Sequence, residues 1–85
     1  MYFVFSIPFK RDRKNLSKEV FRALDKALNL LLSDYRYPSL HSKKLPNSDV
    51  WYARVTRAYR FTFQIDGDTI TLRRVGTHEI LSKER

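Results

Sequence analysis

The sequence has 85 residues, of which 42% are hydrophobic and 31% charged, and its formal net charge is +8. This length predicts a single domain over residues 1–85 with a modest core, and the apolar content excludes an intrinsically disordered chain. Because there is no cysteine, disulfides, a thiolate nucleophile and a cysteine-based zinc site are excluded. The charge indicates a polyanionic partner, namely RNA, DNA or an acidic protein segment, with solubility as the alternative reason for it.

The N-terminal residues predict a strand and then a short basic segment. Residues 2–7 are aromatic and β-branched and stop at Pro8, which favours a first strand. Residues 9–14 predict a short helical turn or a loop. Charges follow the apolar start, so we expect no signal peptide and no membrane span. The two histidines have no metal-ligand spacing, so a cytoplasmic protein without metal or cofactor is expected.

Residues 17–34 predict one long helix. Apolar residues recur at helical spacing from Leu16 to Leu31. Ser17 is a favourable N-cap, and Glu19 places a negative charge in the first turn, where the helix dipole favours it. A loop over residues 35–49 follows, long enough to suggest a function.

The last third predicts a meander of three strands, over residues 51–56, 59–65 and 69–75. A tight turn at residues 66–68 joins the last two, Gly76 ends the final strand, and residues 77–85 are expected to be partly ordered at most. The predicted fold class is therefore α+β: two layers, with an antiparallel sheet of about four strands and an N-terminal helix, or helical hairpin, packed on one face.

Strand alternation predicts a polar surface on the other face of this sheet. The outward positions are Tyr52, Arg54, Thr56, Arg60, Thr62, Gln64, Thr71 and Arg73. None is acidic, each strand contributes an arginine, Lys43 and Lys44 lead into the rim, and His78 and Glu79 follow the last strand. Cations beside an aromatic ring suit single-stranded nucleic acid, although a solvated sheet face would also be polar.

The segments Lys44-Leu45, Trp51 to Val55, Tyr59-Arg60-Phe61 and Ile70 to Gly76 resemble the RelE/ParE toxin superfamily. The resemblance covers the whole chain in topology and about residues 43–79 in motif. It implies the toxin of a type II toxin–antitoxin pair, a RelE-like mRNA interferase that inhibits translation. Its partners would be a cognate antitoxin, mRNA and the ribosome, with no membrane and no metal.

The resemblance also implies a reaction and residue roles. The ribose 2′-hydroxyl would attack the adjacent phosphate and give a cyclic phosphate, which requires a base, an acid and cations. Arg60 matches the family's Tyr-Arg arginine, Arg54 a basic catalytic position, and His78 a position where some members have arginine. RNA or phosphate binding is expected of Lys43, Lys44, Tyr52, Arg73 and Glu79.

The sequence departs from the family pattern at its C-terminal residues. Some ribonuclease members have a catalytic tyrosine there, and residues 80–85 contain none. His78 is then the candidate acid or base that titrates near neutral pH, with a structural role as the alternative. Glu79 would act with His78 or form a surface ion pair. The other functions left open are a non-catalytic module that binds RNA or an antitoxin, and a ParE-like toxin that poisons gyrase.

Overall fold

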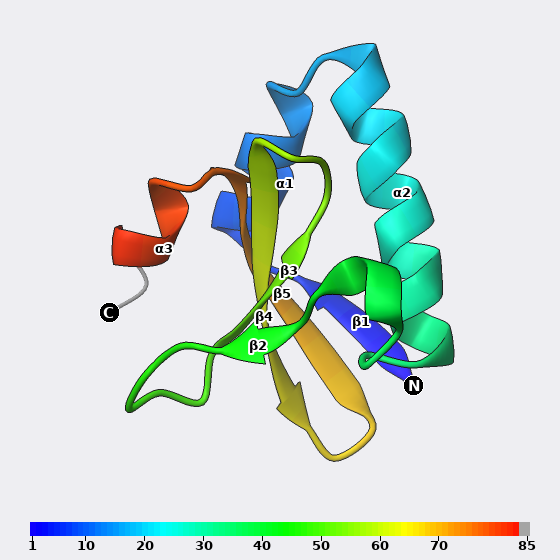
Figure 1. Cartoon of the computed structure of the whole chain (residues 1–85), viewed down its shortest axis with the longest axis vertical. Coiled ribbons are helices and arrows are strands. Elements are labelled where there is room, and N and C mark those ends of the chain that lie inside the picture. Colours follow the sequence, from blue (N-terminus) through cyan, green and yellow to red (C-terminus); the bar gives the residue numbers. More distant parts are fainter. Residues whose placement is uncertain (84–85) are drawn as a thin grey trace.

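The computed structural model describes the backbone of residues 1–83 and the side chains of residues 1–82 (Figure 1). In chain order its elements are β1 (Tyr2–Phe5), α1 (Ile7–Lys14), α2 (Lys18–Ser33), the short 3-10 helix η1 (Pro38–Leu40), β2 (Lys43–Lys44), β3 (Trp51–Arg54), β4 (Tyr59–Asp66), β5 (Thr69–Thr77) and α3 (Ile80–Lys83). Within residues 1–83, no helix has the length and apolarity needed to cross a membrane.

The sheet has five strands in the order β1-β5-β4-β3-β2, and it is mixed. β1 runs parallel to β5, whereas the other neighbours are antiparallel. The prediction of about four antiparallel strands is therefore wrong in number and in one pairing. The α+β class and the helices packed on the sheet are confirmed. The α1–α2 hairpin carries the chain from β1 to β2 at the opposite edge of the sheet, and the meander from β2 to β5 brings it back beside β1. No turn signal announces a parallel pairing between strands this far apart in the sequence.

Two serine caps begin the two long helices. The Ser6 Oγ accepts the backbone N–H of Phe9 at 3.2 Å, with Pro8 in the first turn of α1. The Ser17 Oγ accepts that of Val20 at 3.3 Å, as expected for an N-cap. The helix predicted over residues 17–34 is confirmed. The basic segment, left open between a turn and a loop, is a complete helix of eight residues.

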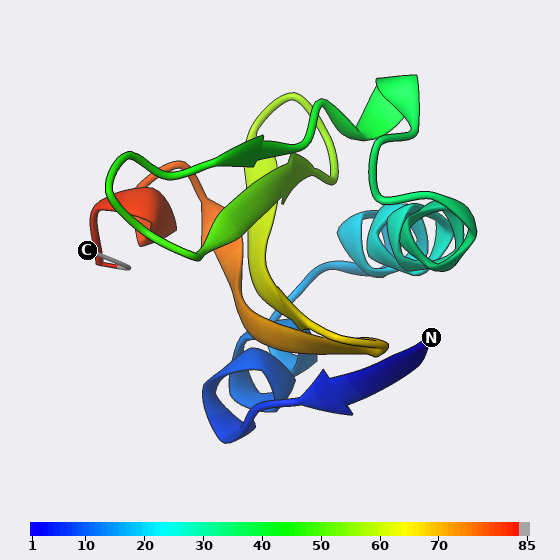
Figure 2. The same cartoon turned by 90° about the horizontal axis from the view of Figure 1, so that it is seen from below.

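α2 covers one face of the sheet, and α1 packs beside the edge of β5 where β1 ends. Phe9 of α1 and Leu24, Leu28 and Leu31 of α2 join one core with side chains from β3, β4 and β5. The strands' share of the buried cluster is Ala53, Phe61, Phe63, Ile70, Leu72 and Val75. Figure 2 shows α2 and α3 on opposite sides of the sheet. The face of the sheet away from α2 is called the polar face below.

A β-bulge interrupts the alternation of β5. Thr62 pairs with Arg74 and Phe63 with Leu72, so Arg73 is the extra residue of β5 in this register. Strict alternation from Leu72 would turn Arg74 toward the helices. The bulge instead places Arg74 in register with Thr62 on the polar face, and returns Val75 to the core.

β5 continues through Gly76 to Thr77, so the prediction that Gly76 ends the strand is wrong. Residues 77–85 were expected to be partly ordered at most; within the described residues, α3 follows β5 and Ile80 is only 6% exposed. A Cβ built on Gly76 would lie 2.9 Å from the Ile80 Cγ2. Gly76 is therefore the notch in which Ile80 packs. Residues 84 and 85 lie outside the described residues.

Candidate functional site

Arg54 and Arg60 face each other across β3 and β4, as a register pair on the polar face. Directly opposed residues of an antiparallel pair have Cα atoms only about 5 Å apart. The next row along the sheet pairs Lys43 with Tyr52, and Tyr52 with Thr62. The structure thus brings together two predicted catalytic arginines and two predicted RNA-binding residues. Two adjacent guanidiniums offer several N–H donors to one phosphate.

The electrostatics of Arg60 reflect this crowding. Burial lowers the pKa of the Arg60 guanidinium, the neighbouring Arg54 charge lowers that pKa further, and Tyr52 raises it. Two like charges placed side by side repel each other, so an anion bound between them would relieve the repulsion.

The Arg60 side chain also closes the loop between β3 and β4. Its Nη1 donates to the carbonyl oxygens of Thr56 at 2.6 Å, Tyr59 at 2.9 Å and Arg57 at 3.1 Å. These bonds fix the guanidinium over the end of the hairpin. A rigid donor loses less conformational entropy when it binds a phosphate.

Farther along the polar face, Arg73 donates to the Gln64 side chain, with 2.6 Å between Nη1 and Oε1. Thr62 was expected at the solvent surface and is fully buried. Its Oγ1 accepts the backbone N–H of Arg74 at 3.0 Å. The Thr62 hydroxyl thus supplies an acceptor for the Arg74 N–H beside the bulge, where the regular hydrogen-bond pattern of the two strands is interrupted. Thr62 therefore supports the bulge rather than binding a ligand.

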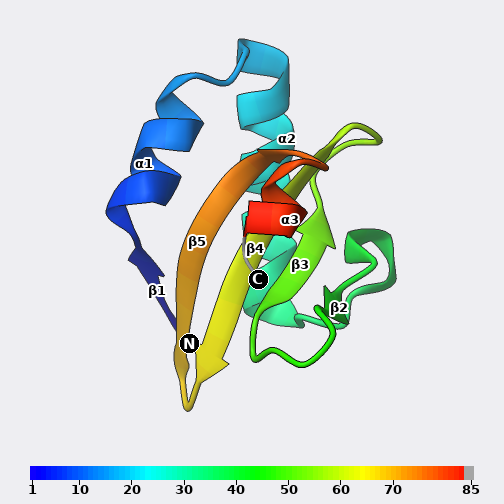
Figure 3. The same ribbon diagram turned by 90° about the vertical axis from the view of Figure 1, so that its left-hand side faces the viewer.

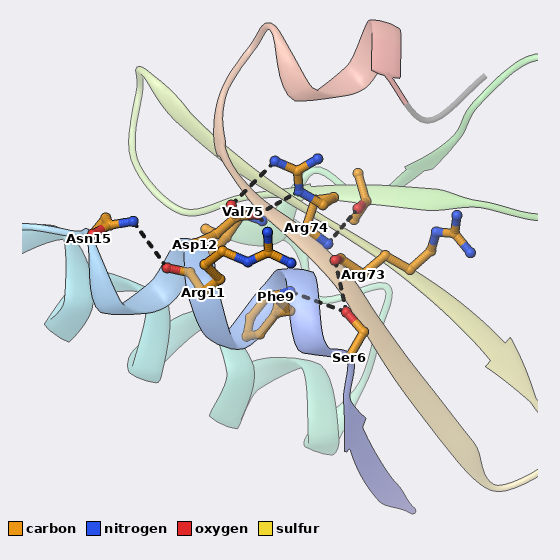
Figure 4. Close-up of polar contacts among 9 residues, drawn as sticks. Ser6, Phe9, Arg11, Asp12, Asn15, Arg73, Arg74 and Val75 are labelled. Carbon is orange, nitrogen blue, oxygen red and sulfur yellow. Dashed lines mark hydrogen bonds and ion pairs between the residues drawn. The ribbon is translucent and has the colours of Figure 1, made fainter.

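Asp12 of α1 holds the C-terminal part of β5, at Arg74 and Val75 (Figure 4). Its carboxylate accepts from the Arg74 Nε at 2.6 Å, the Arg74 Nη2 at 3.2 Å and the backbone N–H of Val75 at 3.2 Å. β1 pairs with β5 only as far as Leu72. Beyond that point α1 takes the place of a strand along this edge. Sequence reasoning missed Asp12, because it lies within a run of cations and its partners are far away in the chain.

The C-terminal residues lie on the polar face beside the arginines. Gly76 is the register partner of Arg60, and α3 packs over it through Ile80. Figure 3 shows α3 in front of β4 and β5, with α2 behind the sheet. His78 and Glu79 are exposed in the turn before α3. Among the described side chains Glu79 forms no ion pair.

Lys44 is separated from the other predicted RNA-binding residues. It pairs in register with Trp51, on the helix side of the sheet, and its Nζ lies 5.8 Å from the centroid of the Trp51 ring. Lys43, one residue earlier, is on the polar face opposite Tyr52. Within residues 1–83 no group of three or more His, Cys, Asp or Glu side chains is placed to hold a metal ion.

No protein-family model matches this sequence, and a search of curated proteins gave no match. Solved structures do match the fold. A YoeB/ParE toxin from Agrobacterium tumefaciens is 13% identical, with a TM-score of 0.81 over 92% of this chain and 99% of the other. The RelBE2 toxin–antitoxin complex from Mycobacterium tuberculosis is 22% identical, with a TM-score of 0.74 over 91% and 96%. The intact RelBE toxin–antitoxin complex from E. coli is 21% identical, with a TM-score of 0.74 over 89% and 94%.

These matches define the class of fold. The chain has the fold of the toxins in toxin–antitoxin systems. The resemblance to the RelE/ParE superfamily is thereby confirmed at the level of the fold.

Proposed function

We propose that this protein is the cytoplasmic toxin of a type II toxin–antitoxin pair and acts as a metal-independent mRNA endoribonuclease associated with the ribosome. The observation that carries the proposal is the Arg54–Arg60 pair on the polar face of a RelE/ParE-like sheet. A repelling guanidinium pair with fixed donors suits the charge that develops on a phosphate during cleavage.

In the proposed reaction, the ribose 2′-oxygen attacks the adjacent phosphorus and loses its proton to a base. The bond from phosphorus to the 5′-oxygen breaks, and that oxygen receives a proton. The products are a cyclic phosphate and a 5′-hydroxyl. Arg54 and Arg60 stabilise the phosphate, and His78 transfers protons with Glu79 beside it. Lys43, Tyr52 and Arg73 bind the RNA along the polar face, and Lys44 binds it at the rim.

The proposed protein partner is an antitoxin with an acidic binding segment. Two of the similar structures are toxin–antitoxin complexes, which supports a partner of this kind. The net charge of +8 favours an acidic segment, because opposite charge speeds association and selects the partner.

The test is expression of the chain without its antitoxin. We expect growth and translation to stop, and Arg60→Ala to relieve the arrest. The matched control is Arg57→Ala. It removes the exposed Arg57 side chain of the same loop but keeps the Arg57 carbonyl, to which the Arg60 Nη1 donates, and it should leave the arrest intact. Messenger RNA from arrested cells should carry new 5′-hydroxyl ends. Arrest that persists unchanged in the soluble, folded Arg60→Ala protein would contradict the mechanism.

A non-catalytic module that binds RNA or an antitoxin is the second candidate. The observation that favours it is the engagement of the Arg60 Nη1 with three loop carbonyls, which gives this arginine a structural role. RNA that is bound but left uncut, on and off ribosomes, would select this candidate. A DNA damage response with intact messenger RNA would instead select gyrase poisoning.

A further inference from the structure

A cavity of about 320 Å³ lies at the end of β3, between α2 and η1. β2 pairs with β3 only at Trp51 and Tyr52. At Arg54, therefore, the edge of β3 borders this cavity instead of another strand. The volume is at the lower end of the range for small-ligand pockets and suits a ligand of about one nucleotide.

The lining of the cavity combines cationic and apolar side chains. Lys26 of α2, His41 after η1 and Arg54 of β3 contribute polar groups, and no carboxylate is among the described residues that line it. Ala27, Leu30 and Leu40 form apolar walls. An anionic group with a flat, largely apolar body matches such a lining.

Arg54 is common to the cavity and the polar face. It is the register partner of Arg60 in the sheet, and it is also among the residues that line the cavity. A strand of RNA whose phosphate is held by the arginine pair would therefore have its neighbouring nucleotide at the mouth of the cavity.

His41 borders the cavity at the end of η1. It is the C-cap of this helix, with a positive φ of 49°, a left-handed conformation that histidine adopts more often than most residues. Leu40, only 1% exposed, anchors the segment, and the His41 N–H donates to the Pro38 carbonyl at 3.2 Å. These contacts hold His41 among the residues that line the cavity. The sequence marked this loop as functional by its length but gave no reason to select His41.

We infer that this cavity binds one nucleotide of single-stranded RNA, next to the phosphate held by Arg54 and Arg60. The inference rests on the proposed function and adds to it a subsite that reads a flanking nucleotide. Lys26 and Arg54 bind the phosphate, His41 hydrogen-bonds the ribose or base, and the apolar walls hold the base.

The test is amide chemical-shift mapping of the ¹⁵N-labelled chain with two probes, and with inorganic phosphate as the anion control. One is adenosine 5′-monophosphate. The other is a single-stranded RNA hexamer with 2′-O-methyl groups, which cannot be cleaved by 2′-attack. Both should shift the amides of Ala27, Leu30 and Leu40. Lys26→Gln should weaken binding about two- to fivefold, as for an exposed ion pair, and Lys18→Gln on the same helix is the matched control. Ala23→Leu, which fills the cavity without a charge change, should abolish the shifts.

The outcomes separate the two proposals. If the hexamer shifts Tyr52 and Arg60 but not the cavity amides, and Lys26→Gln binds like Lys18→Gln, the subsite is refuted and the proposed function stands. If inorganic phosphate reproduces every shift caused by the monophosphate, the cavity is an anion site and the nucleotide inference is wrong. If neither probe shifts the cavity amides, the subsite is refuted, and the expression test with Arg60→Ala decides the proposed function.

Discussion

Asp12 shows how much one side chain contributes to the frame of the site. It satisfies the Val75 N–H on a strand edge that β1 no longer covers, and it pairs with the Arg74 guanidinium. Hydrogen bonds to charged groups contribute about 1.5–3 kcal/mol each, and a buried donor left without an acceptor adds a penalty.

We therefore expect Asp12→Ala to lower the free energy of unfolding by about 2–3 kcal/mol, measured by urea denaturation. Asp25→Ala is the matched control, because Asp25 is exposed on α2 and its loss should change stability by less than about 0.5 kcal/mol. Equal effects of the two substitutions would show that the Asp12 contacts contribute nothing beyond surface charge.

Some residues of the candidate site can be predicted from the sequence, and others cannot. The Arg54–Arg60 pair follows from alternation in two strands joined by a short link, which is local information. Asp12 and Thr62 act through partners far away in the chain or across a bulge. Their roles depend on tertiary packing, which residue pattern alone does not report.

Among the elements, α3 depends on a single notch in β5. Ile80 packs where Gly76 has no side chain, and a Cβ there would approach its Cγ2 to 2.9 Å. Because isoleucine is branched at Cβ, it has few rotamers with which to avoid the clash. Gly76 also pairs with Arg60, so the notch fixes α3 beside the candidate site.

We expect Gly76→Ala to displace α3 and to cost about 1–3 kcal/mol, as overpacking does. Amide hydrogen exchange of residues 80–82 should accelerate in this variant. A double-mutant cycle with Ile80→Ala provides the control: once Ile80 is truncated, adding Gly76→Ala should cost little more, because the two residues share one contact. Fully additive costs would mean that Gly76 acts through its backbone and not through the notch.

The elements also differ in how well the sequence predicts them. The long helix, the meander and its Gly67 turn carry strong local signals, and all three are confirmed. The parallel pairing of β1, the two-residue strand β2 and the bulge at Arg73 carry none. Each is decided by what lies beside it in space: the edge of β5 for β1, the edge of β3 for β2, and the Thr62 hydroxyl for the bulge.

For the whole molecule, the distribution of charge is more informative than its sum. The net charge is +8, yet two of the cations, Arg54 and Arg60, are register partners on neighbouring strands of the polar face, while others lie on α1 and α2. Only cations that contact phosphates contribute to the salt dependence of RNA binding, because each contact releases condensed counterions.

We therefore predict the dependence of RNA affinity on salt concentration. Phosphate contacts from Lys43, Arg54, Arg60 and Arg73 should together contribute about −3 to the slope of log K against log salt, at about −0.7 for each contact with a single strand. Arg54→Gln should make the slope shallower by about 0.7. Arg22→Gln, which removes an exposed arginine of α2, should leave it unchanged. Fluorescence anisotropy of a labelled, uncleavable RNA measures both values. If the two variants change the slope equally, RNA is held by the overall field of a basic protein, and the polar face is not its binding site.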